Sequence, residues 1–306
     1  MSLSFSDVVA LWKADKRLYV RRSTYAVYVQ HCKNHLVPAF GERTAFDEAL
    51  LQASVNTWLE EGLALKTVKD IMLVLRMVLR YGEKLGAWPH VEYKVRYPSG
   101  TQQKKEPATL PGKDLHRLLA YLRKDISYPN LALLLCLQSG LRIGEVCGLQ
   151  WRDLDVAAGI IHVNKTVQRI YVTDGNEREY FLSVDRPKTP SALRDIPLSG
   201  ELKALLRPLK KAANPRHFLL TNAEAPWEPR KLRTYFHTLL QRLGIPKIRF
   251  HALRHTFATR CIESRCDYKT VSAILGHASI STTLDLYVHP GYADKKKVID
   301  RLARGI

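Results

Sequence analysis

Residues 251–259 read HALRHTFAT, a stretch that predicts a helix with two polar side chains in its first turn. His251 and Arg254 are three residues apart and therefore share one face of that helix. Together they can donate hydrogen bonds to two non-bridging oxygens of one phosphate group. The competing interpretation is a core histidine beside an exposed arginine. A zinc site is disfavoured, because Cys261 and Cys266 have a CxxxxC spacing and the stretch lacks an HExxH glutamate.

Upstream, residues 140–149 read GLRIGEVCGL and predict another helix, which begins just after Gly140. Arg142 and Glu145 are again three residues apart on one helical face. A carboxylate that braces a guanidinium in this way leaves the arginine aimed at a phosphate. The competing interpretation is an ordinary ion pair on the surface of a helix.

Downstream, residues 275–289 read LGHASISTTLDLYVH, in which Gly276 and His277 end a predicted helix and Tyr287 follows. A free phenol has a pKa of about 10, so Tyr287 needs cationic neighbours or a base to attack phosphorus near neutral pH. The sequence supplies four candidate neighbours, namely Arg142, His251, Arg254 and His277. The competing interpretation of Tyr287 is an aromatic residue of the core.

Between these motifs, residues 186–198 read RPKTPSALRDIPL. Lys188, between Pro187 and Thr189, is predicted to lie in a hairpin turn that follows a strand. A lysine ammonium in that position can protonate a leaving alkoxide. The competing interpretation is a lysine that is simply solvated. Taken together, the four motifs offer what metal-free phosphoryl transfer requires, which is a set of fixed cations around a pentavalent phosphorus.

In these motifs the chain resembles the tyrosine recombinases, the phage-integrase and Xer-type family, over nearly its whole length. The matching positions are the first arginine Arg142 and its acidic partner Glu145, the lysine Lys188, the H-x-x-R pair His251 and Arg254, the second histidine His277 and the nucleophile Tyr287. His255 also fits the family's H-x-x-R-H string, where the resemblance implies a structural role. Cys266 departs from the family pattern, because relatives often have glycine or another small residue at this position. The departure puts the conformation of this loop in question, and not the chemistry.

The resemblance implies an enzyme that cleaves and rejoins double-stranded DNA through a 3′-phosphotyrosyl intermediate on Tyr287. It implies that two arginines and two histidines stabilise the transition state and that Lys188 is the general acid. No cofactor and no metal is expected, which agrees with a sequence that lacks a GxxxxGK[ST] loop. The implied partners are a homo-tetramer on paired DNA sites and an accessory directionality factor.

Composition favours a polyanionic partner. Lys and Arg total 48 against 29 Asp and Glu, a net charge of +19 with a pI near 9.8. Residues 186–254 hold 15 basic and 4 acidic residues, so much of the excess lies between Lys188 and the H-x-x-R pair. The longest apolar run, Leu131 to Leu137, is far shorter than the ~18 residues that span a bilayer. With no visible signal peptide and five cysteines interpreted as reduced thiols, a cytoplasmic protein is expected.

The chain is expected to be multidomain and mainly α. The resemblance implies a four-helix, SAM-like core-binding domain over residues 1–97 and an α+β catalytic domain over 112–306, with a linker at 98–111 and a tail helix at about 292–304. Helices are predicted in the first domain at Phe5–Tyr19, at Thr24–Leu36 capped by Ser23, at Val55–Glu61 and from Thr67 to the residues before Gly86. In the second domain a small antiparallel sheet is predicted from Ile160–Val163, Thr166–Val172, Tyr180–Val184 and Arg194–Leu198.

Two other functions stay open on the sequence alone. A type IB topoisomerase-like enzyme would relax DNA by the same chemistry without pairing two sites. A catalytically silent DNA-binding protein would keep the fold and lose the reaction, although the complete set of candidate residues argues against it. The arm-binding domain of larger integrases is expected to be absent or to have been removed from this sequence, since the predicted helices begin near Phe5.

Overall fold

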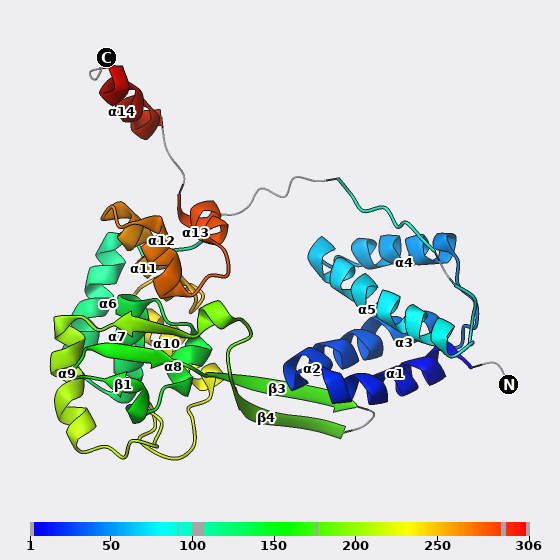
Figure 1. The fold of residues 1–306 in the computed structure, drawn as a ribbon, viewed down its shortest axis with the longest axis horizontal. Coiled ribbons are helices and arrows are strands. Elements are labelled where there is room, and N and C mark those ends of the chain that lie inside the picture. Colours follow the sequence, from blue (N-terminus) through cyan, green and yellow to red (C-terminus); the bar gives the residue numbers. More distant parts are fainter. Residues whose placement is uncertain (1–2, 91, 100–106, 175–176, 289–291, 304–306) are drawn as a thin grey trace. The chain divides into compact units, whose positions relative to one another are not determined.

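A computed structural model of the chain describes residues 3–90, 92–99, 107–174, 177–288 and 292–303 (Figure 1). The chain divides into two compact units, each with its own core. The first contains residues 1–103 together with 170–181, and the second contains residues 104–169 and 182–306. Part of the expected linker, residues 100–106, lies outside the described residues.

The first unit is helical in its N-terminal part, as the sequence predicts. Its elements are α1 (Phe5–Tyr19), α2 (Arg22–His31), a π-helical turn η1 (Cys32–Leu36), α3 (Val37–Phe40), α4 (Glu48–Glu60) and α5 (Leu65–Lys84). Ser4 and Asp7 close a capping box at the start of α1, which fixes the first residue of that helix. Phe5, Trp12 and Leu75 are among the side chains that fill the core of this unit.

The second predicted helix is wrong at both ends. It begins at Arg22 without a side-chain cap, so Ser23 does not cap it, and it continues past Pro38 to Phe40. A proline inside a helix removes one backbone hydrogen bond and clashes with the carbonyl four residues earlier. The wider π turn at Cys32–Leu36, directly before Pro38, lets the helix continue across the proline.

Two further helices are longer than predicted. Asp47 caps α4 through the backbone N–H of Leu50, so this helix begins well before Val55. Helix α5 begins at Leu65 and not at Thr67, and its buried face carries the predicted residues Val68, Ile71, Met72, Leu75, Val78 and Leu79. The period of the apolar residues therefore identified the helices correctly, while the first residues of α2, α4 and α5 were not predicted: Asp47 caps α4, whereas α2 and α5 begin without a side-chain cap.

The second unit combines helices with short strands. Its helices are α6 (Gly112–Lys124), α7 (Tyr128–Ser139), α8 (Ile143–Gly148), α9 (Gly200–Lys211), α10 (Pro229–Arg242), α11 (Ala252–Glu263), α12 (Tyr268–Leu275), α13 (Ile280–Tyr287) and α14 (Tyr292–Ala303), with 3₁₀ turns η2 (Trp151–Asp153) and η3 (Pro190–Ala192). Its core surrounds α7, whose apolar run Leu131 to Leu137 is buried throughout. A helix apolar on all sides belongs in such a core.

The predicted strands form two sheets and not one. A three-stranded antiparallel sheet has the order β1 (Leu154–Asp155), β2 (Ile160–Val163) and β5 (Arg194–Pro197), with Ile161 opposite Ile196. A separate hairpin pairs β3 (Thr166–Asp174) with β4 (Glu177–Asp185). The predicted bounds of β2 are confirmed, while β3 and β4 both extend beyond the predicted residues.

The tail helix α14 runs from Tyr292 to Ala303, close to the predicted range. Ile299 and Leu302, two of the apolar residues expected on one side of it, are exposed, at 64% and 62%. The side chain of the third, Val298, lies outside the described residues.

Candidate active site

The site begins at the end of α7, where Gly140 turns the chain toward α8. Its φ of 64° is in the left-handed region, and a Cβ there would lie 2.7 Å from Cδ1 of Phe257. The Gly140 carbonyl accepts a hydrogen bond from Nη1 of Arg254, at 2.9 Å. Arg254 is only 2% exposed, and its Nη2 has no hydrogen-bond partner among the described residues. One buried donor of this arginine is thus available to a ligand.

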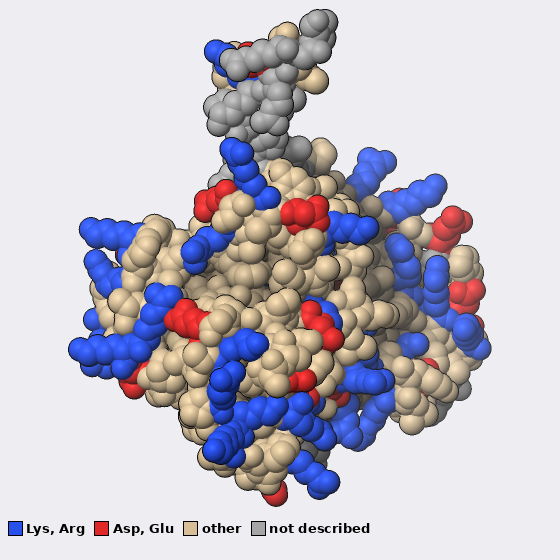
Figure 2. All heavy atoms as spheres, turned by 60° about the vertical axis from the view of Figure 1, so that its left-hand side comes forward, with Lys and Arg blue, Asp and Glu red and all other residues tan. Residues whose placement is uncertain are grey.

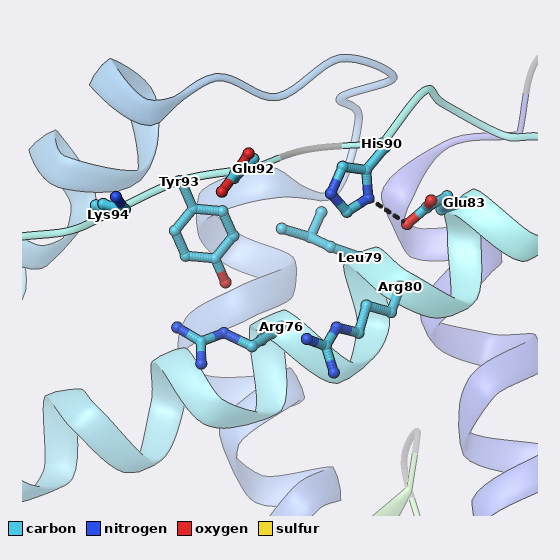
Figure 3. A pocket seen from close by; sticks show the side chains of 8 residues that line it. All are labelled: Arg76, Leu79, Arg80, Glu83, His90, Glu92, Tyr93 and Lys94. Atoms are coloured by element: carbon cyan, nitrogen blue, oxygen red, sulfur yellow. Dashed lines mark hydrogen bonds and ion pairs between the residues drawn. The ribbon is translucent and has the colours of Figure 1, made fainter.

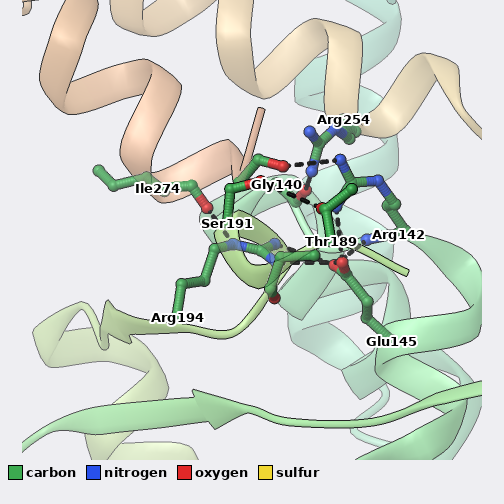
Figure 4. A network of polar contacts seen from close by, with 10 residues as sticks. Gly140, Arg142, Glu145, Thr189, Ser191, Arg194, Arg254 and Ile274 are labelled. Carbon is green, nitrogen blue, oxygen red and sulfur yellow. Dashed lines mark hydrogen bonds and ion pairs between the residues drawn. The ribbon is translucent and has the colours of Figure 1, made fainter. Parts of the chain in front are cut away.

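Glu145 holds two arginines at once (Figure 4). Its Oε1 accepts from Nη1 of Arg142 at 2.7 Å, and its two oxygens accept from Nη1 and Nη2 of Arg194 at 3.0 and 2.9 Å. The Glu145 side chain is 3% exposed, so the pair with Arg142 is not the surface ion pair of the competing interpretation. Burial raises the pKa of Glu145, but the hydrogen bonds and charges of Arg194 and then Arg142 outweigh it, so the net pKa is lowered.

Arg194 is a central residue of this network that the sequence did not single out. It comes from β5, its side chain is 6% exposed, and its Nε donates to the carbonyl of Ile274 at 2.5 Å. It therefore links the carboxylate that braces Arg142 to the last turn of α12 (Figure 4). The only sequence signal was its place at the start of a predicted strand, which does not indicate burial.

The end of α12 positions His277. Gly276 adopts a left-handed φ of 65°, and a Cβ there would lie 2.9 Å from Cδ of Arg194, so the turn needs glycine. The Gly276 carbonyl accepts from Nη2 of Arg142 at 3.2 Å, which ties the next residue to the arginine network. His277 Nδ1 lies 2.8 Å from the Thr283 hydroxyl, which leaves Nε2 as the ring nitrogen available to a substrate.

Burial and the positive charges of the site lower the pKa values of both histidines. Burial, followed by the charges of Arg254 and Arg142, lowers the pKa of His277 to about 4. Desolvation, His255 and Arg254 lower the pKa of His251 to about 4, although this residue at the start of α11 keeps part of its surface open to solvent. Burial and the charge of Arg142 lower the pKa of Arg254 to about 9, so it stays charged near neutral pH. Both histidines are thus neutral donors or acceptors at pH 7.

Tyr287 closes the site from the last position of α13. It is 9% exposed and packs in a small cluster with Ala258, Val271 and Leu275. Burial raises its pKa, while the charges of Arg254 and Arg142 act in the opposite direction. Its hydroxyl lies 2.6 Å from Nδ1 of His255. Sequence reasoning set this histidine aside as structural, although its place after the H-x-x-R pair was visible.

Lys188 is not in a hairpin turn. Strand β4 ends at Asp185, and Lys188 lies in an exposed bend between β4 and η3. Prolines at 187 and 190 cannot donate to a strand ladder, so the strand ends before them. The next residue, Thr189, is drawn beside the Glu145 network in Figure 4. The other six predicted residues form or adjoin one cluster, whereas Lys188 lies in the exposed bend that comes before Thr189 in the chain.

The conformation of the loop at Cys266 follows from its neighbours in the chain. Arg265, and not Cys266, has the left-handed φ of 58°. The backbone N–H of Cys266 donates to the carbonyl of Cys261 at 3.0 Å, which closes the end of α11. None of the five cysteines forms a disulfide bond.

A separate pocket of about 330 Å³ lies in the first unit, against α5 (Figure 3). It gathers Arg76, Leu79, Arg80, Glu83, His90, Glu92, Tyr93 and Lys94. His90 pairs with Glu83 at 2.9 Å, and the Arg76 guanidinium lies 5.6 Å from the centre of the Tyr93 ring. These contacts hold His90 and Tyr93 against α5, and none of the predicted catalytic residues lines this pocket.

Basic side chains cover much of the face shown in Figure 2, with fewer acidic ones between them. On α10, Arg230, Lys231 and Arg233 are exposed while Leu232 and Phe236 are buried, so the solvent side of this helix is basic. Among the described residues, no group of three or more His, Cys, Asp and Glu is arranged to hold a metal ion. Nor does any described helix combine the length and apolar character needed to cross a membrane.

The lowered pKa of His277 predicts a pH effect on stability. Between about pH 6.5 and 4 the unfolded chain binds a proton at this position that the folded chain does not, so the free energy of unfolding falls as the pH is lowered through this window. His277→Gln should remove that contribution, by about 1 kcal/mol per pH unit or less, since solvent screens part of it. Urea unfolding of both proteins across the window measures the difference, with His162→Gln on β2 as the control. Parallel stability curves would contradict the assignment.

Comparison with known proteins agrees with this geometry. The phage integrase family model matches residues 108–294, and a model for the N-terminal SAM-like domain of phage integrases matches residues 4–44. The chain is 30% identical to tyrosine recombinase XerC of Xylella fastidiosa (strain M23), over 86% of this chain and 83% of the relative. It is 24% identical to a tyrosine recombinase XerC-like protein of Caldanaerobacter subterraneus subsp. tengcongensis, over 98% and 83% respectively.

The fold is similar to that of a solved integrase. A structure of a single-residue variant of the Tn1549 transposon integrase in complex with a circular intermediate DNA superposes with a TM-score of 0.74 at 22% identity, covering 98% of this chain and all of that one. The multidomain, mainly α expectation is confirmed, as is the resemblance stated from the motifs. The chain belongs to the phage integrase family and is a tyrosine recombinase, an enzyme that breaks and rejoins DNA strands.

Proposed function

We propose that this tyrosine recombinase cleaves double-stranded DNA with Tyr287 as nucleophile, forming a 3′-phosphotyrosyl link and a free 5′-hydroxyl. The observation that carries the proposal is the clustering of Arg142, Arg254, His277 and Tyr287, which come from separate segments of the chain. Phosphoryl transfer without a metal needs such fixed positive charge. The DNA-bound state of the Tn1549 integrase supports duplex DNA as the substrate class.

The two arginines neutralise the charge that develops on the phosphate. Arg254 contributes the buried, unpartnered Nη2, and Glu145 fixes the direction of Arg142. His251 and His277, neutral before DNA binds, donate to the non-bridging oxygens and gain affinity for protons once the phosphate lies beside them. Because all four groups are held by helix ends and buried contacts, little reorganisation is needed when the phosphorus becomes pentavalent.

Lys188 is proposed to protonate the departing 5′-oxygen. Lys188 lies in the exposed bend after β4, and the next residue, Thr189, is drawn beside the arginine network in Figure 4. The energy of the broken phosphodiester is kept in the phosphotyrosyl bond, so rejoining needs no nucleotide cofactor. The reverse step requires the same lysine as a base toward the incoming 5′-hydroxyl.

The proposal extends to the domains that bind DNA and to the number of subunits in the complex. Residues 1–97 form the core-binding domain and 112–306 the catalytic domain, and both bind one duplex in the cytoplasm, at the nucleoid. The exposed apolar residues Ile299 and Leu302 of α14 support a homo-tetramer on paired sites, with the tail helix docked on a neighbouring subunit. An accessory factor sets the direction of recombination.

The test of the function uses DNA that flanks the gene, because an integrase gene commonly lies beside its own attachment site. Overlapping duplexes with a nick near each position release a short fragment on cleavage, so the covalent adduct cannot rejoin and accumulates. Adduct on a subset of duplexes is the expected result. Efficient relaxation of a supercoiled plasmid without such a site would favour a topoisomerase-like enzyme, and adduct on none of the duplexes, nor on a randomised nicked pool, would favour a catalytically silent protein.

The role of Lys188 predicts a selective defect. Lys188→Ala should slow adduct formation on the normal phosphodiester by about 10²–10⁴-fold, because the leaving alkoxide then departs unprotonated. A substrate with sulfur at the 5′-bridging position leaves as a thiolate, which needs no proton, and should restore the rate. Lys269→Ala, an exposed lysine on α12, is the matched control. An equal defect on both substrates would contradict the assignment.

The basic side of α10 predicts the salt dependence of DNA binding. Each phosphate contact contributes about −0.9 to the slope of log affinity against log salt concentration. The double change Arg230→Ala and Arg233→Ala should therefore flatten the slope by about 2 and weaken binding uniformly across sequences. Lys113→Ala with Lys124→Ala on α6 is the charge-matched control. An unchanged slope would place α10 away from the phosphates.

A further inference from the structure

His255 contacts the proposed nucleophile Tyr287, although the family resemblance implies only a structural role for this histidine. Its Nδ1 lies 2.6 Å from the Tyr287 hydroxyl, well within hydrogen-bond distance. The two side chains come from α11 and α13, and their ring centres are 5.6 Å apart. The His251 ring meets the His255 ring edge-on at 4.6 Å, so the H-x-x-R-H string places two imidazoles side by side, and His255 is the one bonded to the phenol.

Attack by Tyr287 on phosphorus requires a group that accepts the proton of its hydroxyl. Burial raises the pKa of Tyr287, so the phenol is protonated near neutral pH and is a weak nucleophile in that form. The charges of Arg254 and Arg142 favour the phenolate, but neither guanidinium can accept a proton. Among the described residues, His255 is the side chain that both touches the hydroxyl and has an acceptor nitrogen when neutral.

The surroundings keep His255 neutral. Burial and then the charge of Arg254 lower its pKa below the usual value for histidine. The groups that face it are Tyr287 from α13 and His251 and Arg254 from its own helix, with the charge of Arg142 acting on Tyr287 from the turn before α8. No carboxylate is among these groups, and of the two imidazoles in the set it is His255 whose nitrogen lies within hydrogen-bond distance of the Tyr287 hydroxyl.

We propose that His255 is the general base of strand cleavage, a role that rests on the proposed function. The Tyr287 O–H bond breaks and its proton moves to Nδ1 of His255, with Nε2 carrying the other proton. The freed electron pair of the phenol oxygen forms the bond to phosphorus. The bond from phosphorus to the 5′-oxygen breaks, and that oxygen takes a proton from Lys188. In rejoining, the imidazolium returns the proton to Tyr287.

The test measures adduct formation against pH, on the substrate with 5′-bridging sulfur so that Lys188 does not limit the rate. His255→Gln keeps a polar side chain near the hydroxyl but cannot take its proton. At pH 7 it should cleave about 10²–10³-fold more slowly than the wild type. Its rate should then rise about tenfold per pH unit, because only hydroxide or solvent remains to remove the proton. The wild-type rate should change little as the pH is raised above 7.

A second variant separates chemistry from structure. His255→Gly opens space for free imidazole, which should raise its rate in proportion to the imidazole concentration. His162→Gln, a surface histidine paired with Asp195, should match the wild type in every measurement. His255→Gln within about threefold of the wild-type rate, or a defect equal at every pH with no rescue by imidazole, would overturn the proposal. Adduct formation by the wild type in the same assay keeps this outcome distinct from a failure of the proposed function.

Discussion

Tyr287→Phe is expected to abolish the covalent protein–DNA adduct on nicked duplexes while leaving DNA affinity close to that of the wild type. The substitution removes the only atom proposed to bond to phosphorus. It keeps the ring that packs on Ala258, Val271 and Leu275, so the fold of the cluster should persist. Denaturing gel electrophoresis of the trapping reaction measures the adduct, and a mobility shift on intact duplex measures binding.

The matched control is Tyr268→Phe, which removes an exposed phenol at the start of α12. It should form adduct at the wild-type rate. Because His255 loses its hydrogen-bond partner in Tyr287→Phe, a small change in the unfolding midpoint is expected and does not affect the interpretation. Adduct formation by Tyr287→Phe would show that another residue is the nucleophile.

Arg254→Lys is expected to reduce the rate of adduct formation by about 10²–10³-fold. Lysine keeps the charge but supplies one ammonium in place of a planar fork. It can satisfy the Gly140 carbonyl or reach the phosphate, but not both, whereas Arg254 holds that carbonyl with Nη1 and has Nη2 available. Single-turnover rates on the trapping duplexes at saturating enzyme measure the effect on chemistry apart from binding.

Arg260→Lys, on the exposed side of the same helix, is the control for a general effect of the exchange on α11. It should leave the rate unchanged. A wild-type rate for Arg254→Lys would mean that the second guanidinium nitrogen does not contact the phosphate. A large loss of stability with normal single-turnover rates would assign Arg254 to the fold alone.

The candidate residues could be predicted because each motif is local. The spacing of three residues brings His251 near Arg254 and Arg142 near Glu145, and Gly276 ends α12 just before His277. Arg142 does not share a helical face with Glu145 as predicted, because it is the extended N-cap residue of α8 and its backbone N–H donates to the Glu145 carboxylate. These relations involve three or four residues, a range over which helix geometry is nearly fixed. The apolar period of α5 was equally reliable, because its buried face follows the same geometry.

Contacts across the sequence could not be predicted in the same way. The pair Arg194–Glu145 joins residues 49 positions apart, and His255–Tyr287 joins residues 32 apart. Nothing in the surroundings of Arg194 in the sequence distinguishes a buried arginine from an exposed one at the start of a strand. The passage of a helix through Pro38 likewise depended on a π turn, which local propensity does not indicate.

The most direct test of the account is the identity of the residue that carries the DNA. Adduct from the nicked duplexes is digested with protease and nuclease, and the nucleotide-linked peptide is sequenced by mass spectrometry. One modified peptide is expected, with a 3′-phosphate ester on Tyr287 and a free 5′-hydroxyl on the released strand. A linkage to any other residue, or a 5′-phosphate ester, would contradict it.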